Sequence, residues 1–149
     1  MSRFLLALFI SILLSALNTN AQSKGNTTMS GARVITQKEV TDNGDSATVY
    51  YGIASYYADK FNGRETASGE IYSHSKSTAA CNVLPLGTWI RVTNLRNGKS
   101  VILKINDRLH AKNNRVVDLT KSAAQKLGYA GRGLTRVKVE VLGKKKPKD

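Results

Sequence analysis

Between residues 48 and 142, short segments rich in β-branched and aromatic residues alternate with turn sequences, and this alternation restricts the fold more than any other feature. The segments are TVYYGIASYYA, TWIRVTNL, SVILKIND, RVVDL and LTRVKVEVL, and the sequences NGR, LPLG, RNGK and KNNR lie between them. Short runs of this composition, bounded by Gly, Pro and Asn, are typical of strands. Many short strands in one stretch of this size predict a single small β-barrel.

Two local patterns support the strand prediction. In LTRVKVEVL, Val137, Val139 and Val141 alternate with charged residues, which is the period-two pattern of a half-buried strand. Asn97 and Gly98 separate two apolar runs, which is a strong hairpin signal.

One helix is predicted near the end of this region. Thr120 is suited to the N-cap of the segment KSAAQKLG, in which two alanines and a leucine share one face. Gly128 follows and can end the helix.

The two ends of the chain differ in composition from this central region. Residues 1–21 combine a basic start, an apolar run and a small-residue junction, and we expect them to be a signal peptide cleaved after Ala21. The alternative is a retained membrane anchor, although the run is shorter than the ~20 apolar residues that a span needs. The polar residues 22–47 predict a flexible leader, and residues 143–149 predict a solvated basic tail.

The chain is strongly basic, with a net charge of +13. For an exported protein, the available polyanions are cell-wall polymers, anionic lipid headgroups and lipopolysaccharide. No RNA-reading motif or basic and aromatic stripe accompanies the charge, so nucleic acid is not expected as a partner. We expect a monomer that is periplasmic or secreted, is not lipid-anchored, and is not inserted in the membrane once the signal is removed.

The single cysteine, Cys81, limits the chemistry of the chain. One cysteine excludes an intramolecular disulfide and a multi-thiolate zinc site, and no other cluster has metal-ligand spacing, so no metal or cofactor is expected. A lone thiol is a candidate nucleophile only if His74 or His110 activates it. The alternative is a small, packed and inert side chain.

Two carboxylates are candidates for catalysis. Asp107 ends the apolar segment VILKIN beside Arg108, and Glu70 follows a glycine turn in TASGEIY. A carboxylate at the end of a strand can form part of a site or can simply finish the strand. Together the two acids offer a possible carboxyl pair for glycosidic chemistry.

Three segments carry a family resemblance. GIASYYADKFNGRETASGEIY, TAACNVLPLGTWIRVTNLRNGKSVILKINDR and RVVDLTKSAAQKLG resemble the successive motifs of the rare lipoprotein A (RlpA-like) family, over about residues 52–142. The resemblance implies a domain over residues 48–142 with a mainly β fold, a small six-stranded double-psi β-barrel with one or two short helices. It also implies a lytic transglycosylase, which cleaves the bond between N-acetylmuramic acid and N-acetylglucosamine without water. Expansin-like proteins share this fold and loosen wall polysaccharide without evident hydrolysis.

The resemblance assigns roles to single residues. Glu70 matches the acid of the family's Gly-Glu motif, Asp107 matches its Asn-Asp-Arg aspartate, and Cys81 takes the position of a site histidine. Asp107 is expected to act as acid and then as base, with Glu70 stabilising positive charge. An acid with both roles needs a raised pKa, so Arg108 is expected to point away or to bind substrate. The expected substrate-binding residues are Tyr56, Tyr57, Arg64, Thr66, Asn106 and Arg108, with one of the two tyrosines stacked on a sugar.

The sequence departs from the family pattern in ways that leave two hypotheses. A neutral thiol cannot replace the proton transfer of imidazole, Leu109 and His110 replace a Gly-Pro pair, and SYYA replaces the usual SWYG. The family's lipid anchor and C-terminal peptidoglycan-binding repeat domain are also not expected here. The first hypothesis is an exported lytic transglycosylase that acts on peptidoglycan glycan strands. The alternative is a catalytically weak or inactive expansin-like module that binds the wall polysaccharide.

Overall fold

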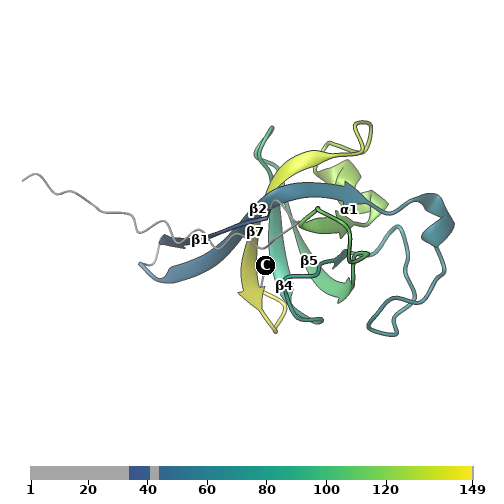
Figure 1. Ribbon diagram of the computed structural model, residues 1–149, viewed down its shortest axis with the longest axis horizontal. Coiled ribbons are helices and arrows are strands. Elements are labelled where there is room, and N and C mark those ends of the chain that lie inside the picture. Colours follow the sequence, from purple (N-terminus) through teal and green to yellow (C-terminus); the bar gives the residue numbers. More distant parts are fainter. Residues whose placement is uncertain (1–33, 41–43, 149) are drawn as a thin grey trace, which may run out of the picture.

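The computed structural model describes residues 34–40 and 44–148 of the chain. Strands are the main regular elements, and one 3₁₀ turn and one α-helix accompany them (Figure 1). The elements are β1 (Ile35–Val40), β2 (Ser46–Tyr56), η1 (Asp59–Phe61), β3 (Thr78–Ala80), β4 (Trp89–Asn94), β5 (Ser100–Asp107), β6 (Val117–Leu119), α1 (Lys121–Lys126) and β7 (Thr135–Gly143).

Six of the strands close into a barrel. Their order around the wall is β2, β6, β3, β5, β4 and β7, and pairing of β7 with β2 closes the ring. The β2–β6 and β3–β5 pairs are parallel, and the other pairs are antiparallel. The expected six-stranded double-psi barrel with one or two short helices is confirmed.

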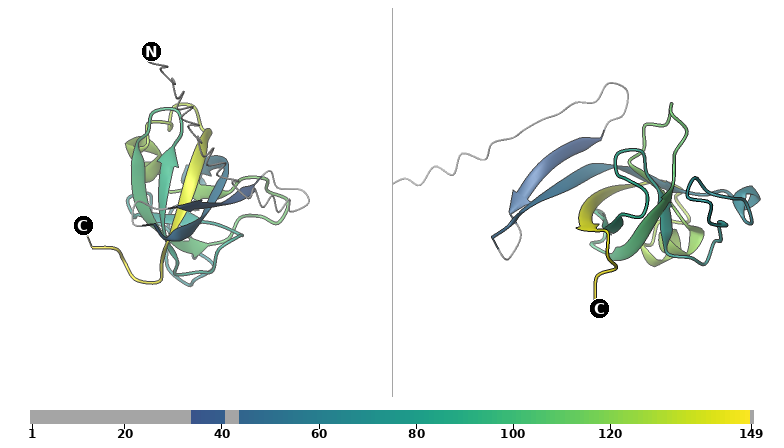
Figure 2. Two further views of the ribbon diagram at one scale, coloured as in Figure 1. Left: turned by 90° about the vertical axis from the view of Figure 1, so that its left-hand side faces the viewer. Right: turned by 90° about the horizontal axis from the view of Figure 1, so that it is seen from below.

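The remaining strand, β1, forms an arm outside the barrel (Figure 2). It pairs antiparallel with the first half of β2, from Ile35 opposite Tyr51 to Val40 opposite Ser46. The expectation of a flexible leader over residues 22–47 therefore does not hold for this strand. The composition of this segment predicts that few of its side chains are buried. Its backbone is nevertheless ordered, because it pairs with the long strand β2. The predicted signal peptide lies outside the described residues.

Cross-strand polar contacts also hold the arm against the barrel. Glu39 of β1 accepts a hydrogen bond from the Lys138 Nζ of β7 at 2.6 Å, and it also accepts one from the Tyr51 hydroxyl. These two donors lower the pKa of Glu39, Lys138 contributing more than Tyr51. These side-chain contacts add to the backbone pairing of β1 with β2.

The core fills the inside of the barrel with aliphatic side chains from every barrel strand. In β7, Val137 and Val139 are fully buried while Arg136 is exposed, which confirms the predicted alternation. The largest fully buried side chains include Ile90, Leu103, Ile105, Leu119, Leu127, Tyr129, Val137 and Val139.

The predicted hairpin and helix are both present, with local differences. The β4–β5 connection is a hairpin, and Gly98 adopts a φ of 73°, which favours glycine. No non-glycine residue in the described chain has a positive φ, so Asn97 does not adopt the conformation of a two-residue type I′ turn. Thr120 is the N-cap of α1, but its hydroxyl donates to the Lys76 carbonyl at 2.6 Å and does not cap the helix. In the described part of the chain, no helix has the length and apolarity to cross a membrane.

Candidate active site

Glu70 lies at the end of a tight loop in the connection between β2 and β3. The backbone N–H of Thr66 donates to the Glu70 carbonyl at 2.8 Å, and Gly69 turns the chain with a φ of 85°. The backbone N–H of Ser68 donates to the Asn106 carbonyl at 3.0 Å. This loop, residues 66–70, therefore rests on the end of β5.

A β-bulge shapes the end of β5. Ala79 of β3 pairs with Ile105 of β5. The next pair is Ala80 with Asp107, so Asn106 has no opposite residue. A bulge bends the strand and redirects the side chains beside it. The side chains of Asn106 and Asp107 consequently both reach the 66–70 loop.

One lysine and one asparagine side chain hold the Glu70 carboxylate. Lys104 Nζ donates to Oε1 at 2.6 Å, and Asn106 Nδ2 donates to Oε2 at 2.7 Å. These hydrogen bonds lower the pKa of Glu70, with Lys104 contributing most and Asn106 next. The Glu70 side chain is 39% exposed, so it is a fixed negative charge at the surface of the site.

The Asp107 carboxylate accepts three hydrogen bonds. Oδ1 accepts from the backbone N–H groups of Ala67 at 2.9 Å and Arg108 at 2.8 Å. Oδ2 accepts from the Tyr57 hydroxyl at 2.7 Å. Since Ala67 and Glu70 belong to the same loop, the structure brings the two predicted carboxylates to one place.

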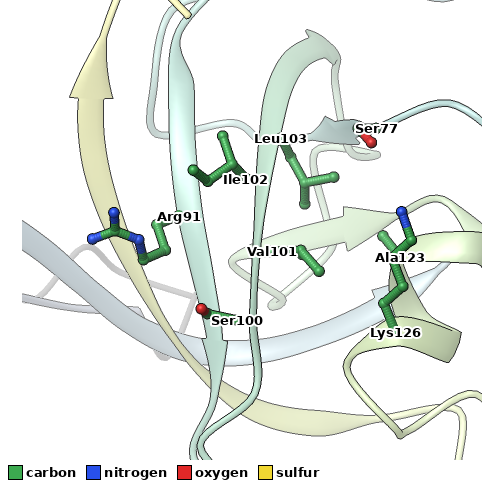
Figure 3. A pocket seen from close by; sticks show the side chains of 8 residues that line it. All are labelled: Ser77, Arg91, Ser100, Val101, Ile102, Leu103, Ala123 and Lys126. Carbon is green, nitrogen blue, oxygen red and sulfur yellow. The ribbon is translucent and has the colours of Figure 1, made fainter. Parts of the chain in front are cut away.

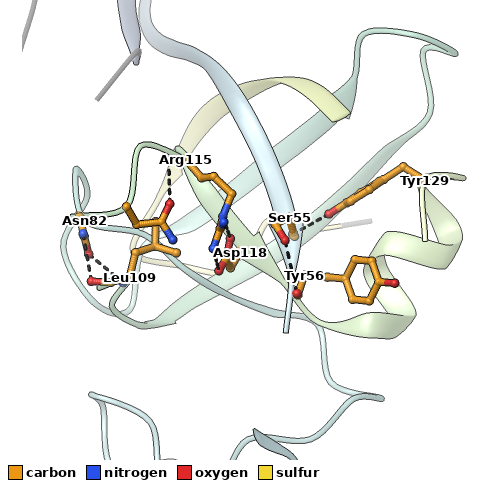
Figure 4. Close-up of polar contacts among 8 residues, drawn as sticks. Ser55, Tyr56, Asn82, Leu109, Arg115, Asp118 and Tyr129 are labelled. Carbon is orange, nitrogen blue, oxygen red and sulfur yellow. Dashed lines mark hydrogen bonds and ion pairs between the residues drawn. The ribbon is translucent and has the colours of Figure 1, made fainter. Parts of the chain in front are cut away.

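A third carboxylate, Asp118, lies close to this place. Ala80 of β3 pairs with Asp107 on one side and with Asp118 of β6 on the other. Paired residues in a sheet point to the same face, so the two aspartates flank Ala80, with about 10 Å between their backbones. Arg115 holds Asp118 by two hydrogen bonds of 2.6 and 2.8 Å (Figure 4). Sequence reasoning did not select Asp118, because the pairing of β3 with both β5 and β6 is not visible in the sequence.

The two predicted sugar-stacking tyrosines point in different directions. The Tyr56 hydroxyl donates to the Ala130 carbonyl at 2.7 Å, and its ring packs edge-on against Tyr129. Figure 4 shows Tyr56 and Tyr129 on the α1 side of β2. Tyr57 faces the carboxylates, where its hydroxyl contacts Asp107. The structure thus separates Tyr56 from the carboxylates and places Tyr57 among them.

Two other predicted substrate contacts lie on the connection between β2 and β3. Arg64 is exposed, and its guanidinium lies 5.5 Å from the centre of the Phe61 ring. Thr66 is buried, and its hydroxyl donates to the Glu70 carbonyl at 2.9 Å. Arg64 is accessible to a ligand, whereas Thr66 shapes the loop.

The Cys81 side chain lies in the hydrophobic core. It is 0% exposed, and burial raises the pKa of the thiol. Its backbone is nevertheless next to the site, because the Cys81 N–H donates to the Asp107 carbonyl at 3.1 Å. A thiol in this position is inaccessible to a polysaccharide and is held in its neutral form.

Arg108 points away from the carboxylate beside it, which is one of the two expected arrangements. Its Nη1 donates to the carbonyls of Cys81 and Leu84, the latter at 2.8 Å. The following residue, Leu109, is buried and exchanges two hydrogen bonds with the Asn82 side chain (Figure 4). The chain after Asp107 is therefore tied to the segment that follows β3.

A cavity of about 360 Å³ lies elsewhere on the barrel, beside β5 and α1 (Figure 3). Neither Glu70 nor Asp107 lines it. The lining residues are Ser77, Arg91, Ser100, Val101, Ile102, Leu103, Ala123 and Lys126. Within residues 34–40 and 44–148, no group of three or more His, Cys, Asp and Glu side chains is arranged to hold a metal ion.

The central part of this chain is similar in sequence to proteins of a known family. Residues 49–139 match the family model described as "Lytic transglycolase". The chain is 50% identical over 91 residues to "Endolytic peptidoglycan transglycosylase RlpA" of Pasteurella multocida, covering 61% of this chain and 31% of that protein. The protein of the same name from Pseudomonas aeruginosa is 55% identical over 89 residues, covering 60% and 26%. The chain thus spans between about a quarter and a third of the length of these curated relatives.

Solved structures share the fold at low sequence identity. A Streptomyces papain inhibitor has a TM-score of 0.51 and 20% identity, covering 62% of this chain and 93% of that one. An expansin of Clavibacter michiganensis has a TM-score of 0.52 and 19% identity, covering 68% and 52%. At this identity, the similarities show a shared fold only.

Proposed function

This chain belongs to the lytic transglycolase family, and from that membership we propose that it is an exported peptidoglycan lytic transglycosylase. The observation that carries the proposal is the convergence of Glu70 and Asp107 on the 66–70 loop. Relatives with about half of their aligned residues identical are named endolytic peptidoglycan transglycosylases. The substrate is the glycan strand, cut between N-acetylmuramic acid and N-acetylglucosamine to leave a 1,6-anhydro end.

Asp107 carries the proton in this reaction. Its protonated carboxyl gives a proton to the glycosidic oxygen as the bond from that oxygen to C1 of the muramic acid breaks. The 6-hydroxyl of the same sugar then bonds to C1, and its proton returns to the Asp107 carboxylate. The ring closes without water, and the enzyme regains its starting state.

Glu70 supports the transition state by its charge. Because Lys104 and Asn106 lower the pKa of Glu70, the carboxylate stays ionised at neutral pH. An ionised carboxylate stabilises the positive charge that develops on the sugar ring as the bond breaks. The exposure of Glu70 allows this charge to face a bound glycan.

One observation supports the alternative, a module that binds the wall polysaccharide without cleaving it. Cys81 takes the position of the family's site histidine, and its side chain is in the core. Of the two histidines, His74 is engaged with Tyr72 and Asp59. His110 accepts a hydrogen bond from the Lys112 N–H at 3.3 Å. Neither histidine makes a hydrogen bond or ion pair with Asp107 within the described residues.

Product analysis separates the two functions. The protein is incubated with purified sacculi, and the soluble products are analysed by mass spectrometry. A transglycosylase releases fragments with 1,6-anhydro-muramic acid ends, which are one water lighter than hydrolysis products. A binding module sediments with the sacculi and releases none.

A further inference from the structure

Tyr57 makes the only side-chain hydrogen bond to Asp107 in the described part of the chain. Its hydroxyl donates to Oδ2 at 2.7 Å, whereas the two donors to Oδ1 are backbone N–H groups. A backbone N–H can only donate, so it cannot accept the proton of the acid form. A tyrosine hydroxyl can both donate and accept. Tyr57 can therefore remain hydrogen-bonded to Asp107 whether the acid is ionised or protonated.

Aromatic neighbours fix the Tyr57 ring. Tyr72 lies tilted against it with ring centres 4.3 Å apart, and Phe61 packs edge-on at 5.9 Å. Tyr72 is itself buried, and its hydroxyl is within 2.9 Å of His74 Nδ1. Rings packed in this way leave little freedom for the Tyr57 hydroxyl to leave Asp107.

The Tyr57 hydroxyl also keeps its own proton. Burial raises the pKa of Tyr57 well above its ordinary value, and the hydrogen bond to Asp107 raises it further. The hydroxyl is consequently neutral throughout the pH range in which a carboxylic acid exchanges protons, and it does not compete with Asp107 as an acid.

We propose that Tyr57 is a positioning residue that holds Asp107 Oδ2 in place through both protonation states of the catalytic cycle. This inference rests on the proposed function, since it assigns a role in that reaction. It assigns Tyr57 a function in acid–base catalysis instead of sugar stacking.

The test is the kinetics of Tyr57→Phe on purified glycan strands. This change removes the hydroxyl and keeps the ring between Phe61 and Tyr72. We expect kcat per folded molecule to fall about tenfold to a hundredfold, with KM near the wild-type value and a somewhat lower melting temperature, because the same hydrogen bond also contributes to stability. Tyr129→Phe is the matched control, because it also removes a tyrosine hydroxyl that bonds within the fold, to the Ser55 carbonyl at 2.8 Å. Its kcat is expected to equal that of the wild type.

The split between kcat and KM separates this role from sugar stacking. A loss of kcat at constant KM indicates an interaction that is made only in the transition state, whereas a loss of sugar stacking would raise KM. A folded Tyr57→Phe variant as active as the wild type contradicts the positioning role. Equal losses in Tyr57→Phe and Tyr129→Phe also contradict it, because they indicate a structural effect.

Failure of the proposed function gives a different result. In that case the wild-type protein itself releases no anhydro product from sacculi or glycan strands. If the wild type is active and Tyr57→Phe is equally active, only the role proposed for Tyr57 is wrong, and the proposed function stands.

Discussion

At the scale of single residues, the two carboxylates of the site are held by different kinds of partner. Glu70 is bound by the side chains of Lys104 and Asn106, and its pKa is lowered. Asp107 is bound by two backbone N–H groups and one hydroxyl, with no ion pair to a described side chain. Glu70 therefore keeps a constant negative charge, whereas no cationic side chain in the described part of the chain is paired with Asp107.

The buried Cys81 leads to a prediction about activity. We expect Cys81→Ser to keep about the wild-type rate of anhydro-product release, because a neutral, inaccessible thiol contributes no nucleophile. The rate per folded molecule and the melting temperature are measured together. A well-folded Cys81→Ser variant without activity would place the thiol in the mechanism.

Cys81→His is the complementary change. Imidazole is larger than a thiol, and overpacking a fully buried position costs about 1–3 kcal/mol of stability. We expect a lower melting temperature without a gain in rate per folded molecule. A faster enzyme would show that this position reaches the substrate.

The sequence predicts which residues belong to the site better than it predicts which of them contact one another. Glu70 and Asp107 were found through their motifs, and the structure brings both to one loop. The hydrogen bond from Tyr57 to Asp107 joins residues 50 positions apart, and no local pattern encodes it. The burial of Cys81 was left open for the same reason, because the direction of a side chain depends on strands that pair later in the chain.

At the scale of elements, the close approach of β2 to the segment before β6 depends on a glycine. The Val116 N–H donates to the Ile53 carbonyl at 2.9 Å, and a Cβ at Gly52 would lie 2.9 Å from the Val116 Cβ. Only a residue without a side chain allows the backbone of β2 to pass this close to Val116.

We expect Gly52→Ala to destabilise the barrel by about 1–3 kcal/mol, because Val116 or its backbone must move. Gly131→Ala is the control, since a Cβ at Gly131 meets no atom within 4 Å. Urea denaturation measures both. A Gly52→Ala variant as stable as Gly131→Ala would show that β2 and Val116 do not pack this closely.

Elements with a strong local pattern were predicted, and elements that depend on pairing were not. The runs that became β2, β4, β5, β6 and β7 are rich in β-branched residues. Strand β3 is only Thr-Ala-Ala, and it is a strand because β5 and β6 pair with its two edges. Strand β1 similarly depends on its long neighbour β2.

At the scale of the whole molecule, the chain is strongly basic and ends in a lysine-rich tail that leaves the barrel (Figure 2). We expect binding to sacculi to weaken as salt rises from low to high concentration, because exposed charges are screened over ~8 Å at physiological ionic strength. Replacing Lys145, Lys146 and Lys148 by Gln should reduce binding at low salt, and replacing them by Arg should not. If salt does not change the binding, contacts in the active site, and not the basic surface, hold the protein on the sacculi.

The central claim is that this chain cleaves glycan strands through proton transfer by Asp107. The most direct test compares anhydro-product release from purified sacculi by the wild type, Asp107→Asn and the control Asp45→Asn, which changes an exposed aspartate far from Asp107 in the sequence. The amide is nearly isosteric with the carboxyl group but cannot transfer a proton. We expect release by the wild type and by Asp45→Asn, and a loss of release by Asp107→Asn with fold and sacculus binding retained. Equal release by Asp107→Asn and the wild type would contradict the mechanism.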